Sequence, residues 1–515
     1  MSDIHADTAF TAAPPASHPF DVVIIGAGSA GAVLANRLSA DPARRVLLLE
    51  AGPDFEPDRY PEAIRNTASV APADYDWGYS SEDVDGRGQP LSSPRGRVVG
   101  GSSAVNGSVA MRARPADFER WAGRGIEGWA WSDVLAAYKA LENTPHGHDD
   151  WHGRSGPFPV RQRQDVENTP SVRAFVAAAK ASGLPYVEDF NGADQEGVGE
   201  YPLNVIDGVR INTGMAYLTA DVRARPNLTI RAQAQVDAVI LEGTRAVGVR
   251  LIDGEILHGD QIILSGGAFG SPAILMRSGI GPADHLKELG IPVVADLPVG
   301  DRLKDHPFFP VVLALKPEAI AMTPPAGAFV WAASETAQSD ELDLHVSVTH
   351  YIDPAFSPTG GALVLAAALT LPDSVGSFRL SSRDPRVAPR IRYNFFEAPG
   401  DLERLVEGVR LARRVAAASP LAELIDQEIL PGSAIDDAAL EAFVRGGAIS
   451  YAHPTSTVPM GADGDATAVV DAWGSVRGID NLRVVDASIF PDIPSVATNL
   501  TTIMLAERVS ARLVG

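Results

Sequence analysis

The sequence predicts an α/β fold, α+β overall, in which a parallel Rossmann-like sheet is joined to a second domain with an antiparallel sheet flanked by helices. Three observations predict it. The β-branched run Val22 to Ile25 breaks directly into a glycine-rich turn, Gly26 to Gly31, before a helical pattern begins. A second predicted strand, Arg45 to Leu49, ends in Glu50. Between Asp305 and Phe396 the pattern changes to several further strands.

The segment Phe20–Gly52 has the order of elements that is typical of a dinucleotide-binding unit. Its glycines allow a tight turn and a close approach to a pyrophosphate, and the helix that follows offers free N–H groups at its N-terminus. Glu50 stands where a carboxylate accepts a hydrogen bond from a ribose hydroxyl, which favours FAD or NAD over NADP. Glycine turns also occur for structural reasons alone, but the strand, helix, second strand and Glu50 together indicate nucleotide binding.

Composition narrows the classes of function. The chain of 515 residues is longer than a domain with a single hydrophobic core usually is, so two interlocked domains are expected. With 43 Lys and Arg against 65 Asp and Glu, the net charge of −22 argues against nucleic acid or an anionic membrane as a partner. The absence of cysteine excludes disulfides, thiolate metal sites and cysteine nucleophiles, and no metal site is expected.

Targeting signals are not expected either. Residues 1–19 lack the basic and apolar regions of a signal peptide and predict a disordered lead-in. No apolar run is long enough to span a membrane, so a cytoplasmic protein is expected.

Further elements follow from turn formers and periodicity. Gly52 to Pro90 predicts a surface loop, with Trp77 a candidate to lie beside a cofactor. Helices are expected from Asp117 to Glu142 and from Asp401 to Ala418, and antiparallel strands between Leu228 and Leu264. The strands expected in the second sheet are 308–316, 342–352, 362–371 and 376–382.

Two segments near the C-terminus carry side chains suited to catalysis. The loop Ser450–Gly461 places His453 among small polar residues, and Asn499 lies where the last helix opens. A histidine with a pKa near its ordinary value of about 6.5 accepts a proton at neutral pH, and an asparagine amide can orient an alkoxide. The alternative for Asn499 is a helix cap, and the alternative for Asp486 is a turn residue.

Other polar residues favour structural interpretations. His345 and His350 are five residues apart, so on a regular strand they face opposite sides and at most one points toward a cofactor; ordinary sheet packing is favoured. Four arginines alternate with small residues and favour a solvated loop over an anion site: Arg95, Arg97, Arg112 and Arg114.

Four segments together resemble the glucose–methanol–choline (GMC) oxidoreductase family, in the correct order and over nearly the whole chain. They are GAGSAG with Glu50, GRVVGGSSAVNGSVAMRARPADFE, GAFGSPAILMRSGIGP, and the pair AHPTSTVPMG and NLRVVDASIFPDIPSVATNLTTIMLAERV. The resemblance implies an FAD-binding domain assembled from three pieces and a substrate-binding domain that covers the flavin. The expected bounds are 20–155, 206–305 and 446–515 for the first, and 156–205 and 306–445 for the second.

The resemblance also implies the site. His453 and Asn499 match the catalytic pair, in the His–Asn form found in the branch of bacterial choline oxidases, choline dehydrogenases and hydroxymethylfurfural oxidases. Members with covalent FAD carry a histidine just before the loop asparagine, where this chain has Val105, so non-covalent FAD is expected. The implied FAD-binding residues are Gly26, Gly28, Ser29, Ala30, Gly31, Glu50, Ala51, Trp77, Val99, Gly101, Asn106, Gly107, Ser108, Val109, Val236, Ala452, Asp486, Ala487, Asn499, Leu500 and Thr501.

The implied activity is oxidation of a primary alcohol, aromatic and heteroaromatic alcohols included, to the aldehyde. The hydride passes to flavin N5, His453 accepts the hydroxyl proton, and O2 (giving H2O2) or another acceptor reoxidises the flavin. The main alternative is a hydroxynitrile lyase on the same FAD scaffold. A light-driven decarboxylase is disfavoured because the cysteine associated with that activity is absent, and a binding protein with an inactive flavin is disfavoured because both catalytic positions are filled.

Overall fold

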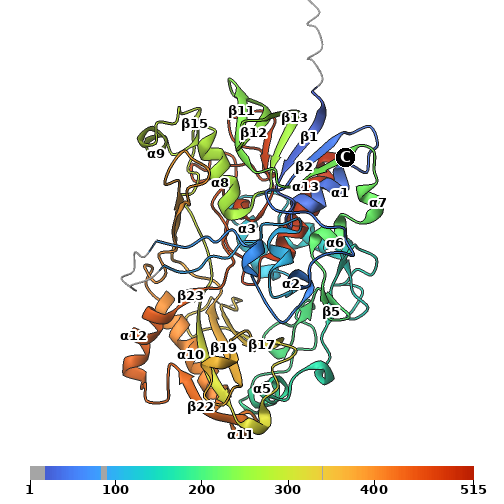
Figure 1. Cartoon of the computed structure of the whole chain (residues 1–515). Coiled ribbons are helices and arrows are strands. Elements are labelled where there is room, and N and C mark those ends of the chain that lie inside the picture. Colours follow the sequence, from blue (N-terminus) through green and yellow to red (C-terminus); the bar gives the residue numbers. More distant parts are fainter. Residues whose placement is uncertain (1–17, 83–89, 339, 515) are drawn as a thin grey trace, which may run out of the picture.

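The computed structural model describes residues 18–82, 90–338 and 340–514. Of the expected lead-in, 1–19, all but the last two residues lie outside this range, and His18 stacks on the His258 ring at 5.4 Å. Figure 1 shows two lobes along one long axis, with β1 (Phe20–Ile25) in one and β19 (Ala362–Leu369) in the other. Each lobe is built on its own sheet.

The first sheet is the parallel sheet that the sequence predicts, with an antiparallel extension. Its strand order is β10-β2-β1-β13-β12-β11, and β24 also pairs with β13. The bounds are β2 Val46–Leu49, β10 Leu228–Arg231, β11 Val236–Glu242, β12 Arg245–Leu251, β13 Ile256–Leu264 and β24 Leu482–Val484. The expected antiparallel pairing is found for β11, β12 and β13 but is wrong for β10, which runs parallel to β2. The short helix α7 (Ala220–Arg223) returns the chain to the start of β2, so that Leu228 pairs with Val46.

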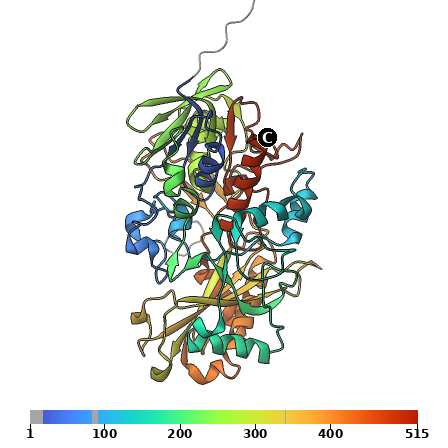
Figure 2. The same ribbon diagram turned by 90° about the vertical axis from the view of Figure 1, so that its right-hand side faces the viewer.

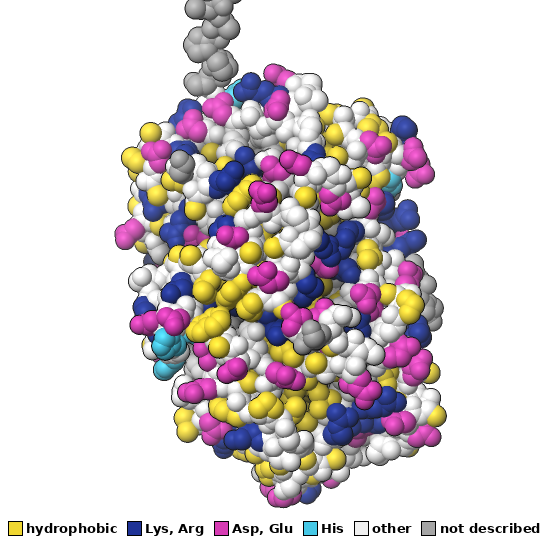
Figure 3. Space-filling view, turned by 180° about the vertical axis from the view of Figure 1, so that it is seen from behind, with side chains coloured by type: hydrophobic (Ala, Val, Ile, Leu, Met, Phe, Trp, Pro, Cys, Tyr) yellow, Lys and Arg dark blue, Asp and Glu magenta, His cyan; other side chains and the backbone are white. Residues whose placement is uncertain are grey.

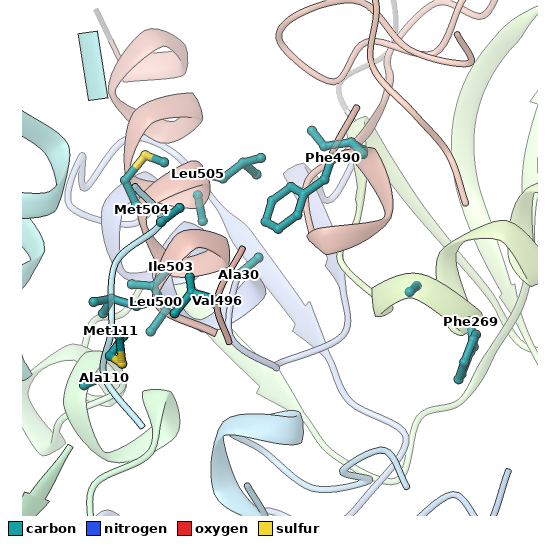
Figure 4. Packing of buried hydrophobic residues seen from close by; sticks show 14 of the residues in the cluster. Ala30, Ala110, Met111, Phe269, Phe490, Val496, Leu500, Ile503, Met504 and Leu505 are labelled. Atoms are coloured by element: carbon teal, nitrogen blue, oxygen red, sulfur yellow. The ribbon is translucent and has the colours of Figure 1, made fainter. Parts of the chain in front are cut away.

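Helices α1 (Gly31–Leu38) and α13 (Asn499–Val514) pack together beside this sheet, although they come from opposite ends of the chain. Figure 4 shows Leu500 and Ile503 of α13 near Met111 and Ala30, with Met504 further along the helix. All five of these residues are fully or almost fully buried. This packing holds the N-terminus of α13 next to the glycine turn that opens α1.

The second sheet is antiparallel, with order β22-β16-β19-β18-β17-β6, and β23 also pairs with β16. The bounds are β6 Gly197–Glu200, β16 Pro307–Leu315, β17 Ala326–Ala332, β18 Leu344–Thr349, β22 Ile425–Leu430 and β23 Ile449–Ser450. Helices α5 (Pro170–Ala181) and α10 (Asp401–Ala416) pack against it, as Figure 2 shows from the side.

One expectation for this region is wrong, and one strand was missed. The strand expected at 376–382 does not join the second sheet, because β20 (Ser377–Arg379) pairs with β21 (Arg390–Arg392) instead. Strand β17 was not predicted from the sequence, since it follows Pro324-Pro325 and contains a glycine. The exact bounds of the two domains remain a prediction, and β6 and β23 show that distant segments complete the second sheet.

The helix expected from Asp117 to Glu142 is two helices, α3 (Pro115–Ala122) and α4 (Trp131–Leu141). Between them Gly125 and Gly128 adopt φ angles of +77° and +82°, which interrupt a right-handed helix. The apolar periodicity on both sides conceals this break.

The remaining elements are short. The helices are α2 Glu62–Arg65, α6 Thr213–Tyr217, α8 Gly267–Arg277, α9 Ala283–Glu288, α11 Leu421–Leu424 and α12 Asp437–Gly447. The strands are β3 Glu142–Asn143, β4 Phe158–Pro159, β5 Arg161–Gln162, β7 Pro202–Leu203, β8 Val205–Ile206, β9 Val209–Arg210, β14 Ile280–Gly281 and β15 Ala295–Asp296.

The surface in Figure 3 mixes acidic and basic side chains, with apolar atoms gathered around the middle and lower parts of that face. Among the described residues, no helix combines the length and apolar character that crossing a bilayer requires.

Candidate active site

The glycine turn between β1 and α1 has the close contacts of a nucleotide-binding turn. Gly26 adopts a φ of +96°, and a Cβ at Gly31 would lie 1.8 Å from the Gly26 carbonyl oxygen. The buried Glu50 accepts hydrogen bonds from the N–H groups of Ala27 (2.9 Å, to Oε2) and Gly52 (2.8 Å, to Oε1). Burial raises the pKa of Glu50 to about 7. The carboxyl group therefore ties the turn to the end of β2, and each oxygen keeps a lone pair for a ribose hydroxyl.

The same turn lies against a second loop and against α13. A Cβ at Gly101 would lie 2.6 Å from the Cα of Gly28, so two backbones meet there directly. Ser29 Oγ donates to Asn499 Oδ1 at 2.7 Å, which occupies the oxygen that a helix cap would use. The Asn499 Nδ2 atom is buried and has no partner in the part of the chain that the structure describes. A buried donor without a partner is costly, and an acceptor on a flavin or a substrate would satisfy it.

The predicted flavin-lining segment, Val99 to Val109, is braced from behind. Arg210 is fully buried, and its guanidinium donates to Ser108 Oγ and to backbone carbonyls of residues 64, 66, 69 and 104. Asn106 Oδ1 accepts from the Ser108 N–H at 2.9 Å, and Ser108 adopts a φ of +64°. This bracing fits a loop whose backbone must keep one conformation against a ligand.

Asp486 joins two elements at the carboxyl edge of the parallel sheet. Its Oδ2 accepts from the Gly267 N–H at 2.9 Å and from Ser271 Oγ at 2.6 Å, and its Oδ1 accepts from the Ser488 N–H at 2.8 Å. These bonds connect the first residues of α8 with the 3₁₀ turn Ala487–Ile489. A contact between Asp486 and FAD stays a prediction.

The other predicted residues lie as follows. Trp77 stacks on Tyr79, with ring centroids 5.8 Å apart, and the Arg97 guanidinium lies 5.0 Å from the Trp77 ring. Thr501 Oγ1 and the Tyr138 hydroxyl are hydrogen-bonded at 2.8 Å. Ala51 follows Glu50, Val236 begins β11, Gly107 lies between Asn106 and Ser108, and Leu500 lies in the first turn of α13. The ends of β1, β2 and β24 bring most of this set to one edge of the sheet, where α/β folds bind nucleotides.

The loop that carries His453 leaves the second sheet at β23 and is held by a buried carboxylate. Asp305 Oδ1 accepts from the His453 N–H at 2.8 Å, and its Oδ2 accepts from Ser450 Oγ at 2.5 Å. Ala452 adopts a φ of +64°, and its carbonyl accepts from Arg95. Burial raises the pKa of Asp305 to about 6. The backbone of His453 is thus fixed on both sides of the residue.

The His453 ring bonds to a second histidine. Its Nδ1 lies 3.0 Å from Nδ1 of His306, and Nε2 of His306 lies 3.0 Å from the Pro494 carbonyl oxygen. Burial lowers the pKa of His306 to about 4. Burial, followed by the charges of His306, Arg95 and His345, lowers the pKa of His453 well below its usual value. Both rings are therefore neutral at neutral pH.

One face of the second sheet forms a wall of mostly apolar side chains, and Tyr451 lies between this wall and His453. The Tyr451 ring lies 5.0 Å from the His453 ring and 4.8 Å from Phe308, and its hydroxyl bonds to Ser347. Cross-strand pairing places Phe308, Ala368 and His345 on this face, followed by Pro310, Ala366 and Ser347 and then by Val312, Val364 and Thr349. None of these side chains is acidic.

His345 and His350 occupy different environments, as their spacing predicts. His345 is 6 % exposed, packs between Phe329 and Trp331, and has an Nε2 atom with no partner among the residues described. His350 instead bonds to the Thr169 hydroxyl at 3.0 Å and to the Ala362 carbonyl at 2.8 Å. Only His345 lies on the His453 side of the sheet.

The solvated-loop interpretation of the arginine-rich segment is wrong for Arg112. That side chain is fully buried and pairs with the equally buried Glu142 at 2.5 Å. Arg114 donates to Gln195 Oε1 and lies over Trp331, and only Arg97 is exposed. The alternation of arginines with small residues did not reveal the partners of Arg112 and Arg114, because Glu142 and Gln195 come from distant segments.

Sequence reasoning missed Asp305 and His306, and it did not connect Arg95 with His453. The available signal was the run Asp-His-Pro at the start of a strand, where two polar residues precede a buried apolar run. His306 and His453 are 147 residues apart, so no local pattern links them.

The parallel sheet and the nucleotide-binding turn define the class of dinucleotide-dependent oxidoreductases. Two family models described as GMC oxidoreductase match residues 20–308 and 372–506. Mitochondrial choline dehydrogenase of Mus musculus is 37% identical over 95% of this chain and 88% of its own length. Oxygen-dependent choline dehydrogenase of Sinorhizobium medicae is 36% identical over 96% of this chain and 95% of its own length. The crystal structure of pyridoxine 4-oxidase from "Mesorbium loti" matches with a TM-score of 0.88 and 34% identity, covering 96% of this chain and 99% of that one.

The chain belongs to the GMC oxidoreductase family. It is an FAD-dependent enzyme that oxidises a small-molecule alcohol and passes the electrons to an acceptor. The expected family, fold class, cofactor and enzyme class are confirmed.

Proposed function

We propose that this chain binds FAD non-covalently and oxidises a primary alcohol with a neutral apolar or aromatic body to the aldehyde. The observation that carries the proposal is the His453 ring. It is fixed through Nδ1 and the backbone, and its Nε2 has no bond to any described residue. This ring packs against Tyr451, which in turn packs on Phe308 of the wall of the second sheet.

Each of these residues has a separate role in the proposed oxidation. Neutral His453 accepts the proton of the substrate hydroxyl at Nε2. The free Asn499 amide donates to the oxygen on which negative charge develops. FAD, when bound, accepts the hydride from the carbinol carbon. The glycine turn and Glu50 would hold the adenosine diphosphate half, and the loop Val99–Val109 would line the ring.

The proposal of a neutral substrate rests on the charged side chains near His453. The wall carries no carboxylate, and the buried Asp305 is already bonded to Ser450, His453 and His306. The Arg95 guanidinium is close enough to lower the pKa of His453 and would repel a cation. The relatives named choline dehydrogenases act on a quaternary ammonium alcohol, so choline is the most informative comparison compound.

The test is an anaerobic absorbance titration of the purified holoenzyme with benzyl, furfuryl and aliphatic primary alcohols and with choline. We expect the visible flavin band to bleach with benzylic or furanic alcohols at lower concentrations than with choline. Recovery of the band and peroxide formation on admission of air would identify an oxidase, and bleaching without recovery a dehydrogenase. Bleaching by choline alone would overturn the substrate class, and no bleaching by any alcohol would favour the lyase.

Attachment of FAD is tested separately. Because Val105 cannot form the covalent bond that a histidine forms in some family members, acid precipitation should release the flavin into the supernatant. Yellow colour that remains with the washed pellet would contradict non-covalent binding. Val105→Ala serves as the control, since it changes the side chain without adding a nucleophile.

The pH dependence follows from the lowered pKa of His453. A histidine accepts a proton only when neutral, so the rate of flavin reduction falls as the pH drops through its pKa in the folded protein. Since that pKa lies well below 6.5, we expect the rate to stay level from about pH 7.5 down to about pH 6.5. The measurement is rapid-mixing flavin reduction across this range; a rate that already halves at pH 7 would contradict the assignment.

A further inference from the structure

We propose that His306 is a positioning residue that fixes the tautomer of His453, holding the proton on Nδ1 and leaving Nε2 free to accept one. This inference deepens the proposed function and rests on it for the role of His453. It concerns the carbonyl–histidine–histidine chain formed by Pro494, His306 and His453.

The direction of each hydrogen bond follows from chemistry. The Pro494 carbonyl can only accept, so Nε2 of His306 carries a proton. The buried His306 ring is neutral, so its Nδ1 has no proton and must accept. The neighbouring Nδ1 of His453, 3.0 Å away, must therefore donate. In a neutral His453 ring this leaves the lone pair on Nε2.

On balance the surroundings oppose a positive charge on either ring. A charged His306 would carry a proton on Nδ1, so His453 could bond to it only by accepting at its own Nδ1 and holding its proton on Nε2. Arg95 and His345 disfavour a positive charge on His453. Asp117 and the carbonyls of Pro494 and Thr370 favour a charge on His306, but burial outweighs them and lowers its pKa to about 4. Tyr451 lies against the His453 ring, and Asp305 accepts from Ser450 and from the N–H groups of His306 and His453 rather than from either ring.

The Pro494 end of the chain is also anchored. The next residue, Ser495, donates through N–H (3.0 Å) and Oγ (2.9 Å) to the buried carboxylate of Asp117. Asp117 in turn pairs with Arg120 at 2.9 Å. The carbonyl that orders His306 is therefore tied to helix α3 and does not move independently of the fold.

This arrangement has a catalytic consequence. When Nε2 of His453 gains the substrate proton, the bond from Nδ1–H to His306 keeps its direction and becomes a charge-assisted hydrogen bond. No ring rotation or tautomer exchange is needed. Without His306, His453 would also populate the tautomer with its proton on Nε2, which cannot accept another.

The experiment compares His306→Phe, His306→Asn and the control His350→Asn in the holoenzyme with ¹⁵N-histidine. His306→Asn keeps an acceptor near the former Nδ1, His306→Phe removes it, and His350 is a buried histidine with separate partners. The His453 signals are identified by their loss in His453→Ala. We expect wild type and His306→Asn to show Nδ1 protonated and Nε2 unprotonated at pH 7.5, and His306→Phe to show a mixture.

The kinetic readout is flavin reduction by the best alcohol found for the wild type. We expect His306→Phe to be slower by roughly 10- to 100-fold, a part of the 10² to 10⁴ that a general base contributes. The acid limb of the pH–rate profile of His306→Phe should also shift to lower pH. The protonated His453 ring loses the hydrogen-bond acceptor that stabilises it, so the pKa of His453 falls further. His306→Asn should recover most of the rate.

A wild-type His453 protonated on Nε2, or a His306→Phe enzyme with unchanged tautomer and rate, would overturn the inference. So would a loss of rate in His306→Asn equal to that in His306→Phe, because it would indicate a packing role. If wild type is not reduced by any alcohol, the proposed function fails, whereas the tautomer measurement still decides the role of His306.

Discussion

Replacing His453 by alanine is expected to leave FAD bound and to slow flavin reduction by an alcohol by about 10² to 10⁴. The reason is the position of His453 at the end of the Pro494–His306 chain, with Nε2 free. The alanine backbone can keep the N–H bond to Asp305, so the loop should hold its conformation. The measurement is anaerobic rapid mixing, with the visible spectrum of the resting enzyme as the check on cofactor content.

His148→Ala is the matched control for that variant, since His148 is a largely exposed histidine. We expect it to behave as wild type. Near-normal flavin reduction in His453→Ala would refute the role of His453, while loss of the yellow colour would assign it to cofactor retention instead.

A large loss of FAD affinity is expected for Gly31→Ala. A Cβ there would lie 1.8 Å from the Gly26 carbonyl oxygen, so the turn must open. Overpacking of this kind costs about 1–3 kcal/mol or more, which is roughly a tenfold to hundredfold weaker binding of FAD. The measurement is the flavin-to-protein ratio after gel filtration, followed by titration of the apoprotein with FAD.

Gly446→Ala is the control, because a Cβ at Gly446 in α12 would meet no atom within 4 Å. Alanine in a helix is favoured over glycine by about 1 kcal/mol, so this variant should bind FAD normally and be at least as stable. Full FAD retention by Gly31→Ala would contradict the account of the turn.

Local patterns predicted the parts of the protein that local sequence determines. The strand, glycine turn and helix of residues 20–38 and the helix α10 follow from neighbouring residues. The place of Glu50 after β2 led to its predicted ribose contact, which stays a prediction, whereas its bonds to Ala27 and Gly52 were not expected.

Features that depend on distant partners were missed. The parallel pairing of β10 depends on the chain returning to β2, and the burial of Arg112 depends on Glu142. The neighbours of His453 show the same limit, because Asp305 and His306 come from just before β16 and Pro494 comes from the segment before α13. Hydrogen-bond direction between such residues requires coordinates, because it depends on which atoms meet.

In the proposed reaction, His453 removes a proton and bound FAD would accept a hydride from the same alcohol. The most direct test of this reaction is anaerobic single-turnover mixing of the holoenzyme with benzyl alcohol and with its α,α-dideuterated form. We expect the flavin band to bleach as a stoichiometric amount of benzaldehyde forms, and we expect deuterium to slow the bleaching. A flavin that stays oxidised while the enzyme cleaves mandelonitrile to benzaldehyde and cyanide would contradict the proposed reaction.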